Sequence, residues 1–482
     1  MTSAQATNGP VVPTRGGPVR GEHRADGSFR FLGIPYAAPP VGALRFAAPV
    51  PHAPWTDPMD ATVPGPTAQR RPFAEITTIP EPTVPGESIL NLNVFTPDLA
   101  PAAALPVLVW IHGGGFVAGS SASPWYDGAA FNRDGVIVVS IGYRLGIEGF
   151  LHLPDAPDNR GVRDWVAALE WVRDNIGVFG GDPAKVTVAG QSAGGGAVQT
   201  LLATPAARGL FRAGISASGA VMHPQDRAAA EAVTRRFAER TGVPATAVAL
   251  RDAAEAQLLA FQDALGAPGP DGDELPTLDL APFADGDLVP RPVPDALADA
   301  AIPLLLGFTE HELAAPRQEE ASLPEGELRV LLGALGLDEA RTARFLAERF
   351  DAGAGGAVTD WLFRAPALAA AERRTRRGHP TWLYQFEWSG TAPGRDGQAY
   401  HCTDVPFAFD LLDAVGVESA LGPRPPQTLA DRMHRSWVAF VRDLTPGAHW
   451  PAYGSARATM RWDAEPHVEH DPLRFVREIW IA

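Results

Sequence analysis

The amino-acid sequence predicts an α/β fold with a large, mostly parallel central sheet and helices on both faces. Two observations lead to this prediction. From about residue 90 onward, short β-branched and aliphatic runs alternate with amphipathic or Ala-rich segments, an order that implies parallel strands joined by crossover helices. One of these alternations, residues 179–196, passes from strand to helix through a serine flanked by glycines.

Composition limits the classes of partner. The chain has 482 residues and a formal net charge of -16, which disfavours nucleic acids and anionic membrane surfaces as partners. Its single cysteine, Cys402, excludes an intrachain disulfide and fits a reducing compartment. The first residues lack the apolar core of a signal peptide, and no stretch is long enough to span a bilayer. We therefore expect a soluble, cytoplasmic protein, and its oligomeric state stays open.

The N-terminal region is rich in Gly and Pro. Pro35, Pro39 and Pro40 argue against a helix within residues 10–50, so this region is expected to form small antiparallel strands and an extended segment. Residues 51–86 are Pro-rich and irregular, and their simplest interpretation is a surface loop, with 64–86 a candidate lid.

The main elements follow in order along the chain. Apolar side chains at helical spacing predict a helix over 161–176 that Gly177 can end, and Pro205 can end the helix after Ser192. A further helix is expected at 427–443. Short apolar runs predict the strands of the central sheet at 90–95, 105–111, 136–141, 185–190, 213–218, 303–307, 381–388 and 459–463.

Two regions interrupt this alternation. Residues 224–265 are Ala-rich and helical in pattern, 266–290 form a Pro/Gly/Asp-rich loop and candidate lid, and 325–377 are again helical. We interpret the breaks near 223–300 and 315–377 as helical insertions that cover the active site of one domain, residues 1–482, and not as independent domains.

The sequence from Gly190 to Gly194 is G-x-S-x-G. Between a buried strand and a helix, this pattern predicts a nucleophile elbow, because the glycines allow a sharp turn that lifts the Ser192 hydroxyl clear of the sheet. The motif alone is weak, since Gly, Ser and Ala are common in turns. Its position between strand and helix makes the signal strong.

A serine hydroxyl needs a neighbouring base, usually a histidine held by a carboxylate. An α/β hydrolase places these groups in the chain order Ser, Asp/Glu, His. Glu310 and Glu312 follow the expected strand 303–307, and His401 follows the strand 381–388. Spacing alone leaves the choice between the two glutamates open.

Stabilisation of an oxyanion requires preorganised N–H groups. The run HGGGF, His112–Phe116, directly follows a buried strand and matches the oxyanion loop of lipases and esterases. Ala193, the residue after the nucleophile, would add an N–H at the positive end of the next helix.

These motifs resemble the type-B carboxylesterase family. The resemblance runs nearly end to end and is carried by FLGIPYAAPPVGALRF, ESILNLNVFTP, WIHGGGF, YRLG, NRGVRDWVAALEWV, NIGVFGGDP, the elbow at 179–194, WPAY and TMRWD. It implies the α/β-hydrolase fold and the hydrolysis of small to medium carboxylic esters through an acyl-enzyme, with no cofactor and no metal.

Carried over residue by residue, the resemblance gives Ser192 as the nucleophile and His401 as the base. The three oxyanion donors match Gly114, Gly115 and Ala193. The family's acid lies in a D-E-G motif, and this chain has His311-Glu312-Leu313 there, which favours Glu312 over Glu310. Gln191 stands where many relatives carry a glutamate, Ile89 replaces a cysteine, and Trp165 replaces a common glutamine.

Phe116 and Gln191 are expected to contact the substrate. Two alternatives stay open. A non-catalytic binding protein could share this fold, although such relatives typically lack part of the triad. The same site could also hydrolyse amides or carbamates, or transfer an acyl group to an alcohol.

Overall fold

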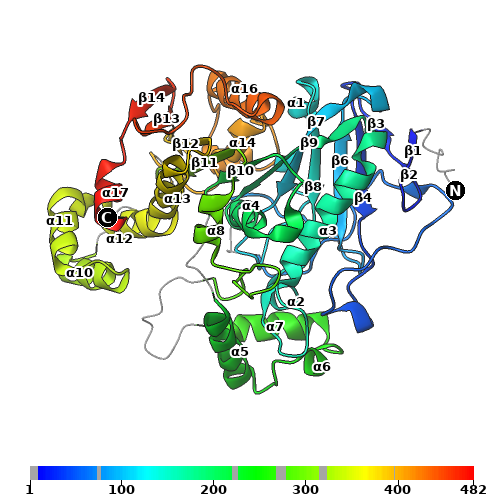
Figure 1. Ribbon diagram of the computed structural model, residues 1–482, viewed down its shortest axis with the longest axis horizontal. Helices are drawn as coiled ribbons and strands as arrows, with labels where there is room; N and C mark the ends of the chain where they lie inside the picture. Colours follow the sequence, from blue (N-terminus) through cyan, green and yellow to red (C-terminus); the bar gives the residue numbers. More distant parts are fainter. Residues whose placement is uncertain are drawn as a thin grey trace.

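A mixed sheet of 11 strands runs through the centre of the protein, in a computed structural model that describes residues 9–72, 78–219, 226–267, 278–313, 323–395 and 397–481 (Figure 1). The strands stand in the order β14-β13-β12-β11-β10-β9-β7-β8-β6-β4-β3. Their bounds are β3 (Glu22–His23), β4 (Phe29–Pro35), β6 (Asn91–Thr96), β7 (Leu105–Ile111), β8 (Ile137–Ile141), β9 (Gly181–Gln191), β10 (Ala213–Ala217), β11 (Leu304–Thr309), β12 (Thr381–Phe386), β13 (Ala458–Trp462) and β14 (His467–His470).

The middle of the sheet is parallel, as expected. Strands β8, β7, β9, β10, β11, β12 and β13 pair in parallel, whereas β6, β4 and β3 at one edge and β14 at the other pair antiparallel. Because parallel strands require crossovers, helices cover both faces of this central part. The mostly parallel sheet predicted from the alternation is confirmed.

Strand β7 shows why its sequence is apolar without a break. Val107, Val109 and Ile111 point into a core shared with helix α3, while Leu108 and Trp110 point into a core shared with helix α16. A strand buried on both faces has no polar side to alternate. The longer helices at the sheet are α3 (Arg160–Asn175), α4 (Ala193–Ala203), α13 (Ala365–Arg376) and α16 (Gln427–Asp443).

Small N-terminal strands are also confirmed. A separate three-stranded sheet contains β1 (Val11–Pro13), β2 (Pro18–Arg20) and β5 (Met59–Asp60), with β1 and β2 antiparallel. Directly after Pro40, however, Gly42–Leu44 form a single 3-10 turn (η1), which contains no proline. The prolines exclude an α-helix, not so short a turn.

The prediction that Gly177 ends the helix was wrong. Helix α3 ends at Asn175 and continues as a 3-10 turn, η4 (Ile176–Phe179), which ends at Gly180 in the left-handed region with φ 84°. A Cβ on Gly180 would clash with the Asp98 carbonyl oxygen, whereas one on Gly177 would meet open space. Gly180 is therefore the glycine that this terminus requires.

Each region expected to be a helical insertion contains several short helices. Residues 224–265 contain α5 (Arg227–Thr241), α6 (Ala247–Leu250) and α7 (Glu255–Leu265), which lie together beside α2 (Gly146–Phe150) (Figure 1). The second insertion contains α10 (Glu325–Ala334), α11 (Glu339–Arg349), α12 (Gly353–Thr359) and a π-helical turn, η7 (Asp360–Arg364), before α13. Residues 268–277 of one candidate lid and 73–77 of the other lie outside the described residues.

The remaining helices of the described residues are short. Within the described residues, no helix is long and apolar enough to cross a membrane. These helices are η2 (Pro101–Ala103), η3 (Pro124–Tyr126), α1 (Ala129–Arg133), η5 (Pro205–Ala207), α8 (Val293–Asp299), η6 (Phe350–Ala352), α14 (Val405–Ala408), α15 (Val417–Leu421) and α17 (Arg474–Trp480).

Candidate active site

The predicted elbow lies at the carboxyl end of β9, the central strand of the sheet. Ser192 links β9 to α4 with φ 58° and ψ -125°, a backbone conformation that costs a non-glycine residue free energy. A Cβ on Gly190 or Gly194 would clash with the backbone, of Gly194 in the first case and of Ile111 in the second. The Ser192 N–H donates to the Ala217 carbonyl at 2.9 Å, which fixes the turn to strand β10.

The glycine loop after β7 lies against this elbow. A Cβ on Gly113 would stand 2.9 Å from the Ser192 Cβ and 2.7 Å from the Gln191 carbonyl oxygen. Gly114 and Gly115 have φ of 106° and 60°, so the loop turns in the left-handed region. The structure therefore brings the glycine loop into contact with the nucleophile candidate.

Three N–H groups in this contact have no protein acceptor. Within the described residues, the N–H groups of Gly114, Gly115 and Ala193 donate to no carbonyl or side chain, and Ala193 is the first residue of α4. Unpaired buried or half-buried N–H groups are rare, and such groups bind anionic oxygen readily. Three such free donors beside the elbow are what a developing oxyanion requires.

The predicted substrate residue Phe116 lies beneath the loop. Its ring is only 2% exposed and packs on Phe150 and Trp165, with ring centroids 5.0 and 6.0 Å away. Its backbone has φ 63°, and its carbonyl accepts a hydrogen bond from the Gly146 N–H at 2.8 Å. The ring therefore anchors the glycine loop to α2 and α3.

The candidate acid and base are in direct contact. His401 Nδ1 hydrogen-bonds to the Glu312 carboxylate, whose second oxygen accepts from the Thr309 N–H at 2.7 Å. The side chain of Glu312 is completely buried, while that of His401 keeps 23% exposure. Burial lowers the pKa of His401, but Cys402 and the Glu312 carboxylate outweigh it and hold that pKa well above its ordinary value.

Glu310, the other glutamate that spacing allowed, does not contact His401. Its side chain is 39% exposed, and its N–H donates to the Phe386 carbonyl at 2.8 Å. Between the two glutamates, His311 joins the acid loop to the base loop: its N–H donates to the Ala399 carbonyl at 2.8 Å, and its Nδ1 accepts from the Ala399 N–H at 3.3 Å. His311, which departs from the D-E-G motif of the family, thus joins the two loops through its own side chain.

The other ring nitrogen of His401 faces Gln191. The Gln191 Nε2 lies 3.1 Å from His401 Nε2, and the Gln191 Oε1 is buried without a partner. Since Glu312 accepts the proton on Nδ1, Nε2 is the acceptor and the amide donates to it. Within the described residues, no hydrogen bond joins the Ser192 hydroxyl to His401, a contact that often tightens only when substrate binds.

Sequence reasoning missed the π-helical turn η7. The ring of Phe363 packs on the His401 imidazole with centroids 5.3 Å apart. The next residue, Arg364, donates to the Glu310 carbonyl and pairs with Asp360 at 2.6 Å. Turns of this kind are frequent at functional sites, but apolar periodicity in an insertion does not show which residue will reach a distant loop.

A second carboxyl group beside the site was also missed. Asp404 is buried and accepts a hydrogen bond from the Tyr384 hydroxyl at 2.7 Å, while its other oxygen has no partner. Burial raises the pKa of Asp404 to about 6, Tyr384 opposes this, and Glu312 adds to it. Among the described residues, no group of His, Cys, Asp and Glu side chains could hold a metal ion.

Comparison with known proteins identifies the relatives of this chain. The family model described as "Carboxylesterase family" matches residues 8–325 and 342–475. The para-nitrobenzyl esterase of Bacillus subtilis is 35% identical over 96% of both chains, and the phenmedipham hydrolase of Pseudarthrobacter oxydans is 33% identical over 92% of this chain and 93% of its own.

Solved structures agree with the sequence comparison. A PNB esterase superimposes with a TM-score of 0.85 and 33% identity, over 98% of this chain and 99% of that one. A carboxylesterase of Geobacillus stearothermophilus gives a TM-score of 0.84 and 34% identity, over the same shares. With the α/β-hydrolase fold and the end-to-end match, the chain belongs to the carboxylesterase family.

Proposed function

We propose that this protein is a serine carboxylesterase whose triad is Ser192, His401 and Glu312. The observation that carries the proposal is the Glu312–His401 pair, clamped by the Thr309 N–H at 2.7 Å and joined through Gln191 to the strained elbow at Ser192. A buried carboxylate on one imidazole nitrogen, with the other nitrogen beside the residue that precedes the elbow serine, fits the arrangement that nucleophilic acyl transfer needs.

The reaction proceeds in two halves. Ser192 Oγ attacks the ester carbonyl carbon while His401 Nε2 takes the hydroxyl proton, and collapse of the tetrahedral intermediate passes that proton to the departing alcohol. Water then attacks the acyl-enzyme, again giving a proton to His401, and Ser192 recovers it as the carboxylic acid leaves. Glu312 orients the ring and stabilises the imidazolium in both halves.

Gly114, Gly115 and Ala193 are proposed as the oxyanion donors. Their unpaired N–H groups support this role, and the loss of one such donor typically costs about 3 kcal/mol in the transition state. Backbone donors cannot be removed by side-chain substitution, so the glycines act through the loop geometry that they allow.

We further propose that residues 1–482 form one domain with insertions at about 223–300 and 315–377, and that the substrate is a small to medium ester. Gln191 would contact the bound ester, because its amide lies beside the base nitrogen. Phe116 would act on the substrate through the position of the glycine loop, since its ring packs in the core.

Replacement of Ser192 tests the mechanism. Ser192→Ala should reduce kcat for p-nitrophenyl butyrate on the order of 10⁶-fold, because the nucleophile and its proton are both lost. An organophosphonate should label the wild-type protein at Ser192 and leave the variant unlabelled. Retained turnover by a pure sample of the variant, with unchanged thermal stability, would overturn the triad and favour another site.

A further inference from the structure

The first residue of the glycine loop, His112, has a position that the triad does not explain. Its side chain is 2% exposed, and its Nδ1 lies 2.8 Å from the carbonyl oxygen of the next residue, Gly113. A carbonyl oxygen only accepts, so Nδ1 carries the proton and donates. Burial lowers the pKa of His112 to about 4, so the ring is neutral near pH 7.

Two further contacts hold this imidazole in place. It stacks on Tyr143, with centroids 4.5 Å apart and planes at 24°, and the Tyr143 hydroxyl donates to the His112 carbonyl at 2.9 Å. On the other side, a Cβ on Gly119 would clash with His112 Nδ1 and the Gly113 carbonyl oxygen. The contact between the His112 ring and the Gly113 carbonyl thus lies in space that any larger residue at position 119 would occupy.

The Gly113 carbonyl shares its peptide plane with the N–H of Gly114. The structure contains no cis peptide bond among the described residues, so these two groups point in opposite directions across one rigid plane. A hydrogen bond that fixes the carbonyl therefore also fixes the direction of the Gly114 N–H, which has no protein acceptor. The next carbonyl, of Gly114, accepts from the N–H groups of Val117 and Ala118, so the His112 ring is the one side chain that hydrogen-bonds to the Gly113 carbonyl among the described residues.

We infer that His112 is a positioning residue, whose Nδ1–H holds the Gly113–Gly114 peptide so that the Gly114 N–H faces the reacting carbonyl oxygen. This inference rests on the proposed function, because it gives His112 a task only if the Gly114 N–H binds an oxyanion. The imidazole does not touch the substrate. It acts on the transition state more than on the bound ester, because hydrogen bonds to the oxygen strengthen as charge develops there.

Three substitutions separate this role from simple packing. His112→Asn places an amide nitrogen near the position of Nδ1 and keeps the donor, while His112→Gln carries the same amide one methylene farther and misses the carbonyl. His112→Leu keeps bulk without a donor. The measurements are kcat and KM for p-nitrophenyl butyrate, and inhibition by an alkyl trifluoromethyl ketone, whose adduct with serine carries an oxyanion, against the matching methyl ketone.

The Leu and Gln variants should lose kcat by about 10- to 100-fold with little change in KM, because one oxyanion donor is misaimed and not removed. Affinity for the trifluoromethyl ketone should fall in parallel, affinity for the methyl ketone should not, and the Asn variant should recover most of both losses. If the Leu variant does not fold, the Asn–Gln pair carries the test.

Equal activity of all variants, or an Asn variant as impaired as Gln, would overturn the inference and leave His112 as a packing residue. Equal losses in kcat and in methyl ketone affinity would overturn it too. Failure of the proposed function gives a different result, since Ser192→Ala would then keep its turnover whatever stands at position 112.

Discussion

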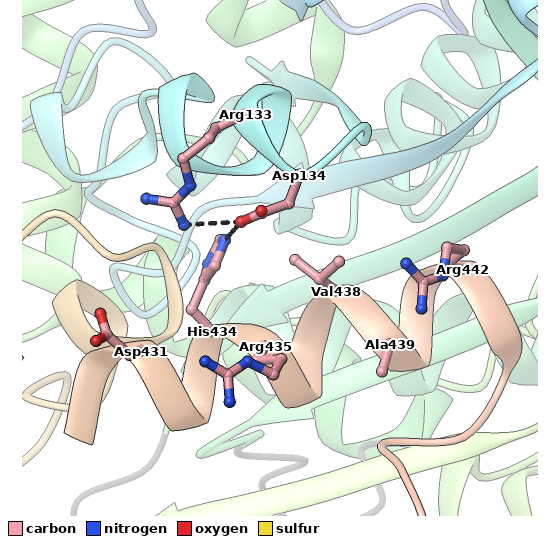
Figure 2. A pocket seen from close by; sticks show the side chains of 8 residues that line it. All are labelled: Arg133, Asp134, Asp431, His434, Arg435, Val438, Ala439 and Arg442. Atoms are coloured by element: carbon pink, nitrogen blue, oxygen red, sulfur yellow. Dashed lines mark hydrogen bonds and ion pairs between the residues drawn. The ribbon is translucent and has the colours of Figure 1, made fainter. Parts of the chain in front are cut away.

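Two histidines of this protein, His401 and His434, each contact a carboxylate on one ring nitrogen but differ in what the other nitrogen faces. His401 pairs with Glu312 through Nδ1 and leaves Nε2 to an amide donor, Gln191. His434 of helix α16 presents Nδ1 to the Ala408 carbonyl at 2.9 Å and Nε2 to the Asp134 carboxylate at 3.1 Å. Figure 2 shows this second pair, beside a surface cavity of about 290 Å³ between α1 and α16.

The difference lies in what the second nitrogen faces. Both nitrogens of His434 face oxygen acceptors, so neither is left open to take a proton from a reacting group. His401 faces an acceptor on one side and a donor on the other, which keeps a lone pair on Nε2. A histidine–carboxylate pair is therefore a candidate base only where the remaining nitrogen is open to a proton.

Among substitutions at these two histidine–carboxylate pairs, removal of the Glu312 charge should lower activity most. Glu312→Gln should lower kcat on the order of 10⁴-fold, because the ring loses the group that fixes its tautomer and stabilises the imidazolium. The same substitution should move the pH midpoint of kcat/KM downward, since a negative charge that raises the His401 pKa is lost. Steady-state kinetics from pH 5 to 9 measure both.

Glu310→Gln is the matched control for that substitution. Glu310 stands two residues away, is 39% exposed and does not contact His401, so kcat should stay close to the wild-type value. A large loss in the Glu310 variant with a small one in the Glu312 variant would transfer the role of acid to Glu310.

The two sides of the site differed in how far the sequence could predict them. The elbow at Ser192 and the loop at Gly114 depend on backbone sterics within a few residues, and such constraints are visible as glycines in a short motif. The acid depends on which of two nearby glutamates a loop turns inward. Spacing did not distinguish Glu310 from Glu312 as the acid, and the family resemblance favoured Glu312, which contacts His401.

Contacts between segments far apart in the chain could not be predicted from the sequence. The apolar pattern located the second insertion as helical, but not the π-helical turn that brings Phe363 onto the His401 ring. The same holds for Gly180, which ends the 3-10 turn η4 after helix α3 and has the Asp98 carbonyl beside it in space. In both cases the deciding neighbour comes from elsewhere in the chain.

Gln191→Glu tests how the group beside His401 Nε2 affects the pKa of the imidazole. A carboxylate beside Nε2 would stabilise the imidazolium, so the pH midpoint of kcat/KM should rise by about one unit and activity at pH 7 should fall. The wild-type midpoint should itself lie above the ordinary 6.5, because Cys402 and Glu312 raise the His401 pKa. Gln191→Met, similar in size but uncharged, should raise the midpoint less, because it removes the amide hydrogen bond to the neutral ring but adds no negative charge. A midpoint that moves equally in both variants would contradict an electrostatic cause.

Asp134→Asn should have the smallest effect. Burial raises the pKa of Asp134, but Arg133 and His434 outweigh it and hold that pKa below its ordinary value. A depressed carboxyl pKa stabilises the fold above the unfolded pKa, and this contribution is lost as pH falls through the folded value. The Asp134 side chain is 37% exposed, so solvent screening limits the loss to about 1 kcal/mol or less.

Thermal unfolding at pH 7 and at pH 3 tests the Asp134 variant. The difference in Tm from wild type should be small at pH 7 and smaller at pH 3, where the wild-type carboxylate is itself partly protonated. The kcat should not change, because both nitrogens of His434 already face oxygen atoms of the protein. A marked fall in kcat at unchanged Tm would mean that the α1–α16 pair is coupled to the site around His401, and that the two histidines are not independent.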